Sequence, residues 1–260
     1  MILTAHQPTY LPWPGLLAKA AVADVFVILD NVSFERNSFI NRNRIRTHAG
    51  WQWLTVPVVL AHRRFGPGQP RSAAPWSHRQ ICDIEIAPGN NWRRKHRRAL
   101  EVHYGKAWDR APSELLELYY DQPRGYISTV AIESTQCLFR AFGIKTRVVL
   151  ASALDLDPPS VPYNMLIKTW RVMSGSDKIL HLCQRLNASA FLFGAQARGY
   201  ADASSFRAAG VEPLIQTYQP QPYTQAYPGF VPGLSALDLL LNEGPRAREI
   251  MLAGHSHAPL

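Results

Sequence analysis

The residues best suited to chemistry in this sequence follow its first predicted strand. Residues 2–7 (ILTAHQ) are predicted to form a strand, and the Pro-rich segment after them must be a loop. His6 and Gln7 therefore lie at the carboxyl end of a strand, where open α/β sheets bind ligands. With an ordinary pKa near 6.5, His6 is a candidate general base or acid. A purely structural histidine, hydrogen-bonded to the backbone, is the alternative.

A second group of candidates follows the next predicted strand, an apolar run that ends at Asp30 in the same relative position as His6. Further along, Asn41, Arg42, Asn43 and Arg44 alternate amide and guanidinium groups. An extended backbone places the two amides on one face and the two guanidinium groups on the other. One face would line a site and the other would hold the fold. A solvated basic loop is the alternative.

His96 is a third candidate, in a helix predicted to begin at Asn91. Trp92, His96 and Leu100 share one helix face, so we expect His96 to point inward although Lys95 and several arginines surround it. A buried histidine beside so much positive charge stays neutral, as a base requires. A core histidine without a chemical role is the alternative.

A Gly-rich turn, residues 194–200, is the fourth candidate. It follows a predicted buried strand, and its backbone N–H groups could face an anion beside Arg198 and Tyr200. Ser235 and Asp238 are predicted to cap a helix. The sequence contains no GxSxG elbow and no spacing typical of metal ligands, so we predict neither a metal site nor a cofactor.

Positive charge is concentrated in one quarter of the chain. Residues 36–98 contain 13 basic and two acidic residues, a net charge of +11, whereas the rest carries 15 basic and 17 acidic residues, or −2. Twelve of the 13 are Arg, which suits fork-like recognition of phosphate or carboxylate, so we expect an anionic partner. Four tryptophans lie in the same stretch: Trp51, Trp53, Trp76 and Trp92. They leave nucleic-acid binding open, although no RRM, KH or helix-turn-helix signature is present.

The elements that must position these residues alternate between strand and helix, which predicts an α/β fold with a mostly parallel sheet flanked by helices. Strands are predicted at 2–7, 25–29, 51–60, 82–87, 146–152, 188–194 and 211–219. Helices are predicted at 16–23, from 91, and at 113–120, 127–142, 176–187 and 203–210. We expect a single domain, 1–247, with possible halves 1–88 and 144–247 around a helical insert, 89–143. Loops are predicted at 61–80 and 155–164, and a loose C-terminal tail at 248–260.

Composition excludes several classes of protein. With 260 residues and 47% hydrophobic residues, the chain is not intrinsically disordered. Three cysteines without a CxxC pair provide no disulfide framework. No apolar run approaches the ~18–20 residues that span a bilayer, and the N-terminus does not resemble a signal peptide. We therefore expect a cytoplasmic protein without a membrane partner.

Several of these segments, in this order, resemble the WbqC-like family. They are HQPTYLPWPG, ADVFVILDNVSF, NRNRIRT, WQWLTVPV, NNWRRKHRRALEVHY, ILHLCQRLNASAFLFGAQARGYADASSFRAAGVEP and FVPGLSALDLLLNEGP. The resemblance covers about residues 1–247. It implies a biosynthetic enzyme for polysaccharides or natural products, and the reaction most often suggested is acyl or aminoacyl transfer to an amine. Family members usually carry a second Asp and a Gly-Pro pair where this chain has Asn31 and Gly194-Ala195, so no role that needs two adjacent carboxylates is carried over.

The resemblance and the residues together favour a cofactor-independent transferase. His6 or His96 would deprotonate the attacking amine, with Asp30 as a further catalytic candidate. The amides of Gln7, Asn41 or Asn43 would stabilise the oxyanion. The remaining candidate binding residues are Tyr10, Arg36, Arg42, Arg44, Lys95, Arg198 and Tyr200. They would receive an anionic small molecule or a carrier-bound donor, which makes an acyl carrier protein a candidate partner.

Two other classes stay open. A nucleotidyltransferase-like, nucleotide-binding enzyme is the first alternative, although PWPG stands where such folds have HxGH and the second His is lacking. A nucleic-acid-binding protein is the second, and specific nucleic-acid binding is not expected.

Overall fold

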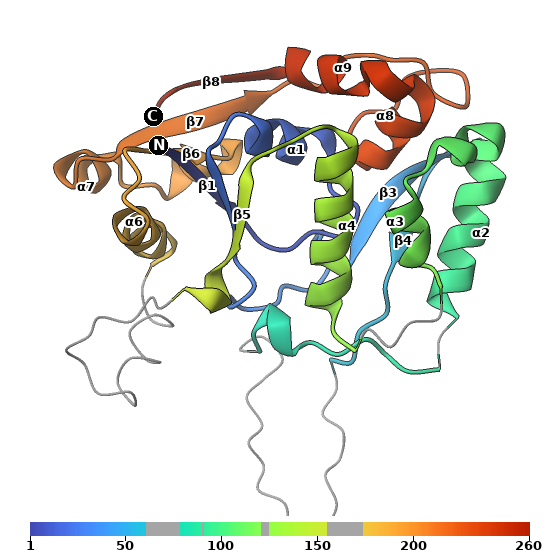
Figure 1. Ribbon diagram of the computed structural model, residues 1–260, viewed down its shortest axis with the longest axis horizontal. Helices are drawn as coiled ribbons and strands as arrows, with labels where there is room; N and C mark the ends of the chain where they lie inside the picture. Colours follow the sequence, from blue (N-terminus) through green and yellow to red (C-terminus); the bar gives the residue numbers. More distant parts are fainter. Residues whose placement is uncertain (61–78, 90, 121–124, 155–173) are drawn as a thin grey trace, which may run out of the picture.

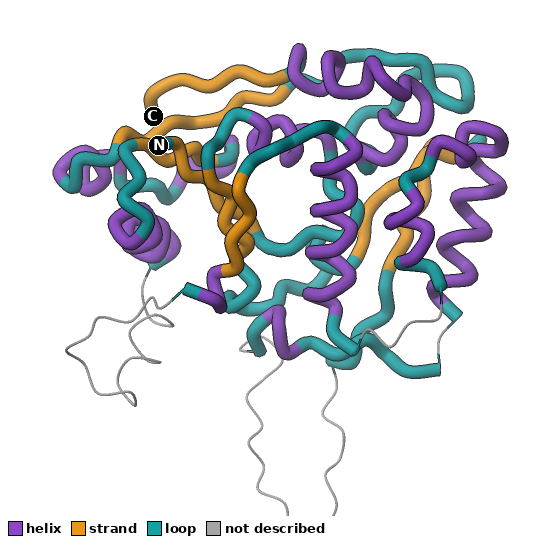
Figure 2. The backbone as a smooth tube through the Cα atoms, in the orientation of Figure 1, coloured by secondary structure: helices purple, strands orange, loops and turns teal. Residues whose placement is uncertain are grey.

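The computed structural model describes residues 1–60, 79–89, 91–120, 125–154 and 174–260. It contains a six-stranded sheet with helices on both faces, and a separate two-stranded hairpin to one side (Figures 1 and 2). The predicted α/β class, with a mostly parallel sheet, is confirmed. Most of the predicted loop 61–80, which includes Trp76, and the predicted turn 155–164 lie outside the described residues.

The main sheet has the order β5-β2-β1-β6-β7-β8, and only the pairing of β8 with β7 is antiparallel. Its strands are β1 (Ile2–His6), β2 (Val25–Ile28), β5 (Arg147–Leu150), β6 (Ala190–Phe193), β7 (Glu212–Tyr218) and β8 (His255–Pro259). The α-helices are α1 (Pro14–Ala21), α2 (Trp92–Tyr104), α3 (Ser113–Glu117), α4 (Ile127–Ala141), α6 (Gly175–Arg185), α7 (Ala203–Ala208), α8 (Ala236–Glu243) and α9 (Ala247–Ala253).

Alternating residues of the inner strands divide the core between the two faces of the sheet. Leu3 and Val27 pack in one cluster with residues of α6 and α7, whereas Phe26 and Ile28 pack in the other with α1 and α4. Figure 1 shows these helix pairs on opposite sides of the strands. This alternation follows from the two-residue repeat of a strand, and it accounts for runs that are apolar throughout.

The order of the strands reverses between β1 and β6. The chain passes from β1 through α1 to β2 and later to β5, always on one side of β1. It then crosses by α6 to the other side, where β6 pairs with β1 and β7 with β6. A doubly wound sheet binds its ligand at such a switch point, outside the carboxyl ends of the strands. The loops after β1 and β6, both predicted from sequence as candidate sites, border this point.

The hairpin consists of β3 (Arg42–Thr47) and β4 (Gly50–Thr55), which pair with each other in a two-stranded antiparallel sheet. The predicted strand 51–60 therefore extends only to Thr55. The predicted strand 82–87 is wrong: residues Ile81–Asp83 form a 3₁₀ turn, followed by isolated bridges at Glu85 and Ile86. The backbone of this segment bonds to the loop after β2, through Cys82 N–H to Asp30 O, instead of a neighbouring strand.

The expectation of a loose C-terminal tail is also wrong. Residues 248–260 contribute most of α9, whose Met251 is fully buried, and all of β8. Strand β8 pairs with β7 from Leu214↔Pro259 to Tyr218↔His255. Strands from both predicted halves join in one sheet, with Leu3 opposite Phe191. Within the described ranges, no helix combines the length and the apolar character needed to cross a membrane.

Candidate functional site

His6 is the last residue of β1 and lies at the switch point. Its Nδ1–H donates to the carbonyl of Gln7 at 2.9 Å, and the Thr9 hydroxyl donates to the same oxygen at 3.1 Å. This contact fixes the tautomer and leaves the Nε2 lone pair as the basic atom. Among the described residues, neither His6 Nε2 nor the Gln7 side-chain amide has a hydrogen-bond partner. Both groups remain available to a ligand.

Lys19, which sequence reasoning missed, lies buried beside this histidine. It projects from α1 with only 4% exposure, and its Nζ donates to Ala5 O at 3.0 Å. The carbonyl is accessible because the β1–β6 ladder covers only Ile2 and Leu3 of β1. No described carboxylate pairs with Lys19. The only sequence signal was a lysine in the middle of a helix that is otherwise rich in Ala and Leu.

Burial determines the charge of both groups, and Lys19 also acts on His6. Burial lowers the pKa of Lys19 to about 8. Burial, and then the charge of Lys19, lower the pKa of His6 to about 4, against a smaller opposing effect of the Gln7 hydrogen bond. At neutral pH the switch point therefore holds a neutral imidazole beside a predominantly cationic amine. A neutral base next to a cation without a counter-ion can accept a proton and stabilise developing negative charge.

His96 points inward, as its helix face predicts, into a separate network. The Tyr10 hydroxyl donates to His96 Nδ1 at 2.9 Å and bonds to the Tyr119 hydroxyl at 2.9 Å. The other ring nitrogen bonds to the backbone of Thr55. His96 is 5% exposed, and burial lowers its pKa to about 4. Since both nitrogens are engaged, the network joins α2, the hairpin and the loop after β1.

The buried His96 predicts a loss of stability in acid. The unfolded chain takes up a proton near pH 6.5, but folded His96 does so only near pH 4, so stability falls as the pH drops through this window. His96→Gln, which preserves hydrogen bonding, should remove about 3 kcal/mol of the acid-induced loss in the free energy of unfolding. Urea unfolding at pH 7 and pH 4 measures it. The exposed His48→Gln is the control, and an equal effect of both variants would contradict the assignment.

Asp30 and the two hairpin asparagines are engaged in holding the fold. Both carboxylate oxygens of Asp30 bind Ser152, one to its N–H at 2.9 Å and one to its hydroxyl at 2.5 Å. Asn43 donates to Leu11 O at 2.6 Å, and Asn41 donates to the carbonyl of residue 56 at 2.8 Å. Leu11 has a φ of 47°, so the bond from Asn43 fixes a backbone conformation that leucine rarely adopts. The amide face of β3 thus holds the fold.

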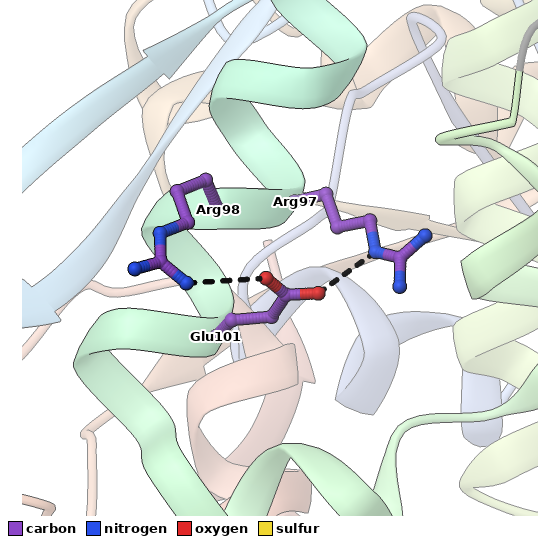
Figure 3. Close-up of polar contacts among 3 residues, drawn as sticks. All are labelled: Arg97, Arg98 and Glu101. Carbon is purple, nitrogen blue, oxygen red and sulfur yellow. Dashed lines mark hydrogen bonds and ion pairs between the residues drawn. The ribbon is translucent and has the colours of Figure 1, made fainter.

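Lys95 lies away from the switch point, in a basic groove of about 700 Å³ on the outer side of α2. Arg94 and Lys95 line this groove together with Arg97 and Arg98, which both pair with Glu101, at 2.8 and 3.9 Å (Figure 3). The predicted binding residues Arg36, Arg198 and Tyr200 are exposed, the last two in and after a 3₁₀ turn (Ala195–Gly199) that follows β6.

Asp238, predicted as a helix cap, has another role. Ser235 caps α8 by accepting from the N–H of Leu237 at 3.1 Å. Asp238 is fully buried and accepts hydrogen bonds from the hydroxyls of Tyr104 at 2.7 Å and Tyr223 at 2.6 Å. Burial raises the pKa of its carboxyl group. In the sequence, an acidic residue within the apolar run of α8 was the sign that Asp238 would be buried with polar partners.

Comparisons with known proteins agree with the segments listed from the sequence. A family model described as the WbqC-like protein family matches residues 7–250. An uncharacterized protein of Mycobacterium tuberculosis, Rv1507c, is 28% identical over 249 residues, which cover 94% of this chain and 95% of the relative. No solved structure matches the chain.

Proposed function

The chain belongs to the WbqC-like protein family, and from this premise we propose that it is a biosynthetic transferase. It transfers an acyl or aminoacyl group to the amine of a sugar or natural-product intermediate. One observation carries the proposal: at the β1/β6 switch point, neutral His6 lies beside the ammonium of Lys19. In the described part of the chain, His6 Nε2 has no hydrogen-bond partner and Lys19 has no carboxylate partner. Amide formation needs these two features, a base for the amine proton and a cation for the oxyanion.

The reaction follows from these positions. The amine nitrogen attacks the carbonyl carbon of a thioester, which forms the C–N bond and places negative charge on the carbonyl oxygen. Lys19 Nζ stabilises that oxyanion, an effect worth about 3 kcal/mol for a well-placed donor. His6 Nε2 accepts the proton that the attacking nitrogen loses. When the C–S bond breaks, the thiolate leaves and takes this proton from His6.

In this proposal the acyl donor is an anionic molecule or is bound to an acidic carrier protein. The groove on α2 supports it, since Arg94 and Lys95 face it without a described acidic partner. Arg97 and Arg98 share one glutamate, so the groove keeps a net positive charge. A carrier's acidic surface would dock on this groove through complementary charge.

Amide formation from a thioester tests the proposed function. The purified protein is incubated with acylated and aminoacylated pantetheine, free and carrier-bound, and with a panel of amino sugars. We expect amine-dependent thiol release, matched by an amide product in mass spectrometry, and faster turnover with the carrier-bound thioester. Release of pyrophosphate from ATP or CTP with Mg²⁺, without any amide, would contradict the proposal and favour a nucleotidyltransferase.

A further inference from the structure

A continuous row of aromatic rings leads from His6 to the surface of the hairpin. The ring centroids lie 5.3 Å apart from His6 to Trp13, 5.3 Å from Trp13 to Phe39, 5.8 Å from Phe39 to Trp53, and 5.6 Å from Trp53 to Trp51. The row ends at Trp51, which is 44% exposed, a high value for a tryptophan. Core packing alone does not require an aromatic row that ends in solvent.

Two arginines of the same β3 face lie on this row. The guanidinium of Arg42 lies 4.2 Å from the centroid of Trp53, and that of Arg44 lies 5.1 Å from the centroid of Trp51. No carboxylate within the described ranges pairs with either one. Arg42 donates through one Nη atom to the carbonyl of Asn37, and the Nε atom of each arginine is buried without a partner. A guanidinium is planar by delocalisation and stacks on a ring through its face, so the Nη groups that the protein does not bond can face a phosphate group.

We propose that this row, Arg42 and Arg44 with Trp51 and Trp53, binds a substrate that carries a nucleoside diphosphate. The inference rests on the proposed function, because it places the reacting end of that substrate at His6. Side chains two residues apart on one strand face are about 7 Å apart at their Cα atoms, which allows one guanidinium for each phosphate. The exposed indole of Trp51 offers a stacking surface for the base.

The basic groove on α2 fits this ligand less well. No tryptophan lines the groove, and the charges of Arg97 and Arg98 are partly neutralised by Glu101. Among the described residues, the row on the hairpin combines aromatic surface, guanidinium groups without a carboxylate partner, and continuity with His6. The row therefore extends from the exposed Trp51 to the switch point.

Binding of UDP, measured by calorimetry and by quenching of tryptophan fluorescence, tests the inference. At about 150 mM salt, where weak surface electrostatics are screened, we expect UDP to bind more tightly than uridine or pyrophosphate. Arg44→Gln should weaken UDP binding by about 10- to 100-fold, because it removes a charged hydrogen-bond donor. Trp51→Ala should weaken UDP about 10-fold and leave pyrophosphate unaffected. Arg98→Gln, with the same charge change on the 75%-exposed side chain, is the matched control.

The outcomes separate the inference from the proposed function. Selective loss of UDP binding in Arg44→Gln, with Arg98→Gln unchanged, supports the inference. Absence of UDP binding to the unmodified protein, or equal losses in both arginine variants, overturns it. Neither of these results bears on amide formation with free amino sugars, because the proposed reaction requires His6 and Lys19 but not the aromatic row. Conversely, UDP binding without any transferase activity would leave the binding row in place and remove its catalytic role.

Discussion

Replacing His6 with asparagine should lower the turnover number of amide formation by about 10²- to 10⁴-fold, the usual contribution of a positioned general base. The asparagine Nδ2 can replace His6 Nδ1 as the donor to Gln7 O, so the loop after β1 keeps its anchor. No atom then stands at the position of Nε2 to accept the amine proton. Turnover is measured with saturating amine and thioester, and the far-UV circular dichroism shows that the variant is folded.

His96→Gln is the matched control, because the two histidines have the same lowered pKa but different surroundings. Both ring nitrogens of His96 are bonded, to Tyr10 and to the Thr55 backbone, whereas His6 Nε2 is free. We therefore expect His96→Gln to keep a turnover number near that of the unmodified protein. Full activity in His6→Asn, or an equal loss in the two variants, would show that His6 is not the base.

The sequence predicted those strands and helices whose ends are marked by their own residues. Strands β1, β2 and β6 are apolar runs that end at polar or glycine residues, and α4 ends before Gly143, whose φ of +62° favours glycine. It did not predict the switch point, because that depends on Ile2 pairing with Ala190, far along the chain. Long-range pairing of this kind leaves no local pattern.

The sequence did not predict the C-terminal strand β8, and the reason is physical. Strand β8 (HSHAP) is an edge strand with exposed side chains, so backbone bonds to β7 hold it and no apolar alternation is required.

Within the candidate site, the sequence indicated His6 and Gln7 by their place after a strand. Lys19 could not be found in this way, because its chemical character comes from burial and from its contact with Ala5 O.

Arg46 anchors the hairpin to the C-terminal part of the chain. It continues the β3 face of Arg42 and Arg44, but it is only 3% exposed. Its guanidinium donates to five backbone carbonyls, two in the hairpin turn and three in a distant loop: Thr47, Gly50, Tyr227, Pro228 and Gly229. Its charge also opposes the rise in the pKa of buried Asp238. Removing Arg46 takes the guanidinium donor away from these five carbonyls and a positive charge away from Asp238.

Arg46→Met should therefore lower the free energy of unfolding by about 3–5 kcal/mol, as expected when one partner of a buried charged network is removed. Arg44→Met, two residues away on the same face, makes the same change where the side chain only stacks on tryptophan, and about 1 kcal/mol should be lost. Urea unfolding of both variants at pH 7 gives the difference. Equal losses would mean that stacking, and not the carbonyls around Arg46, holds the hairpin. A larger loss in Arg46→Met would assign the two arginines separate tasks, one in the fold and one free for a ligand.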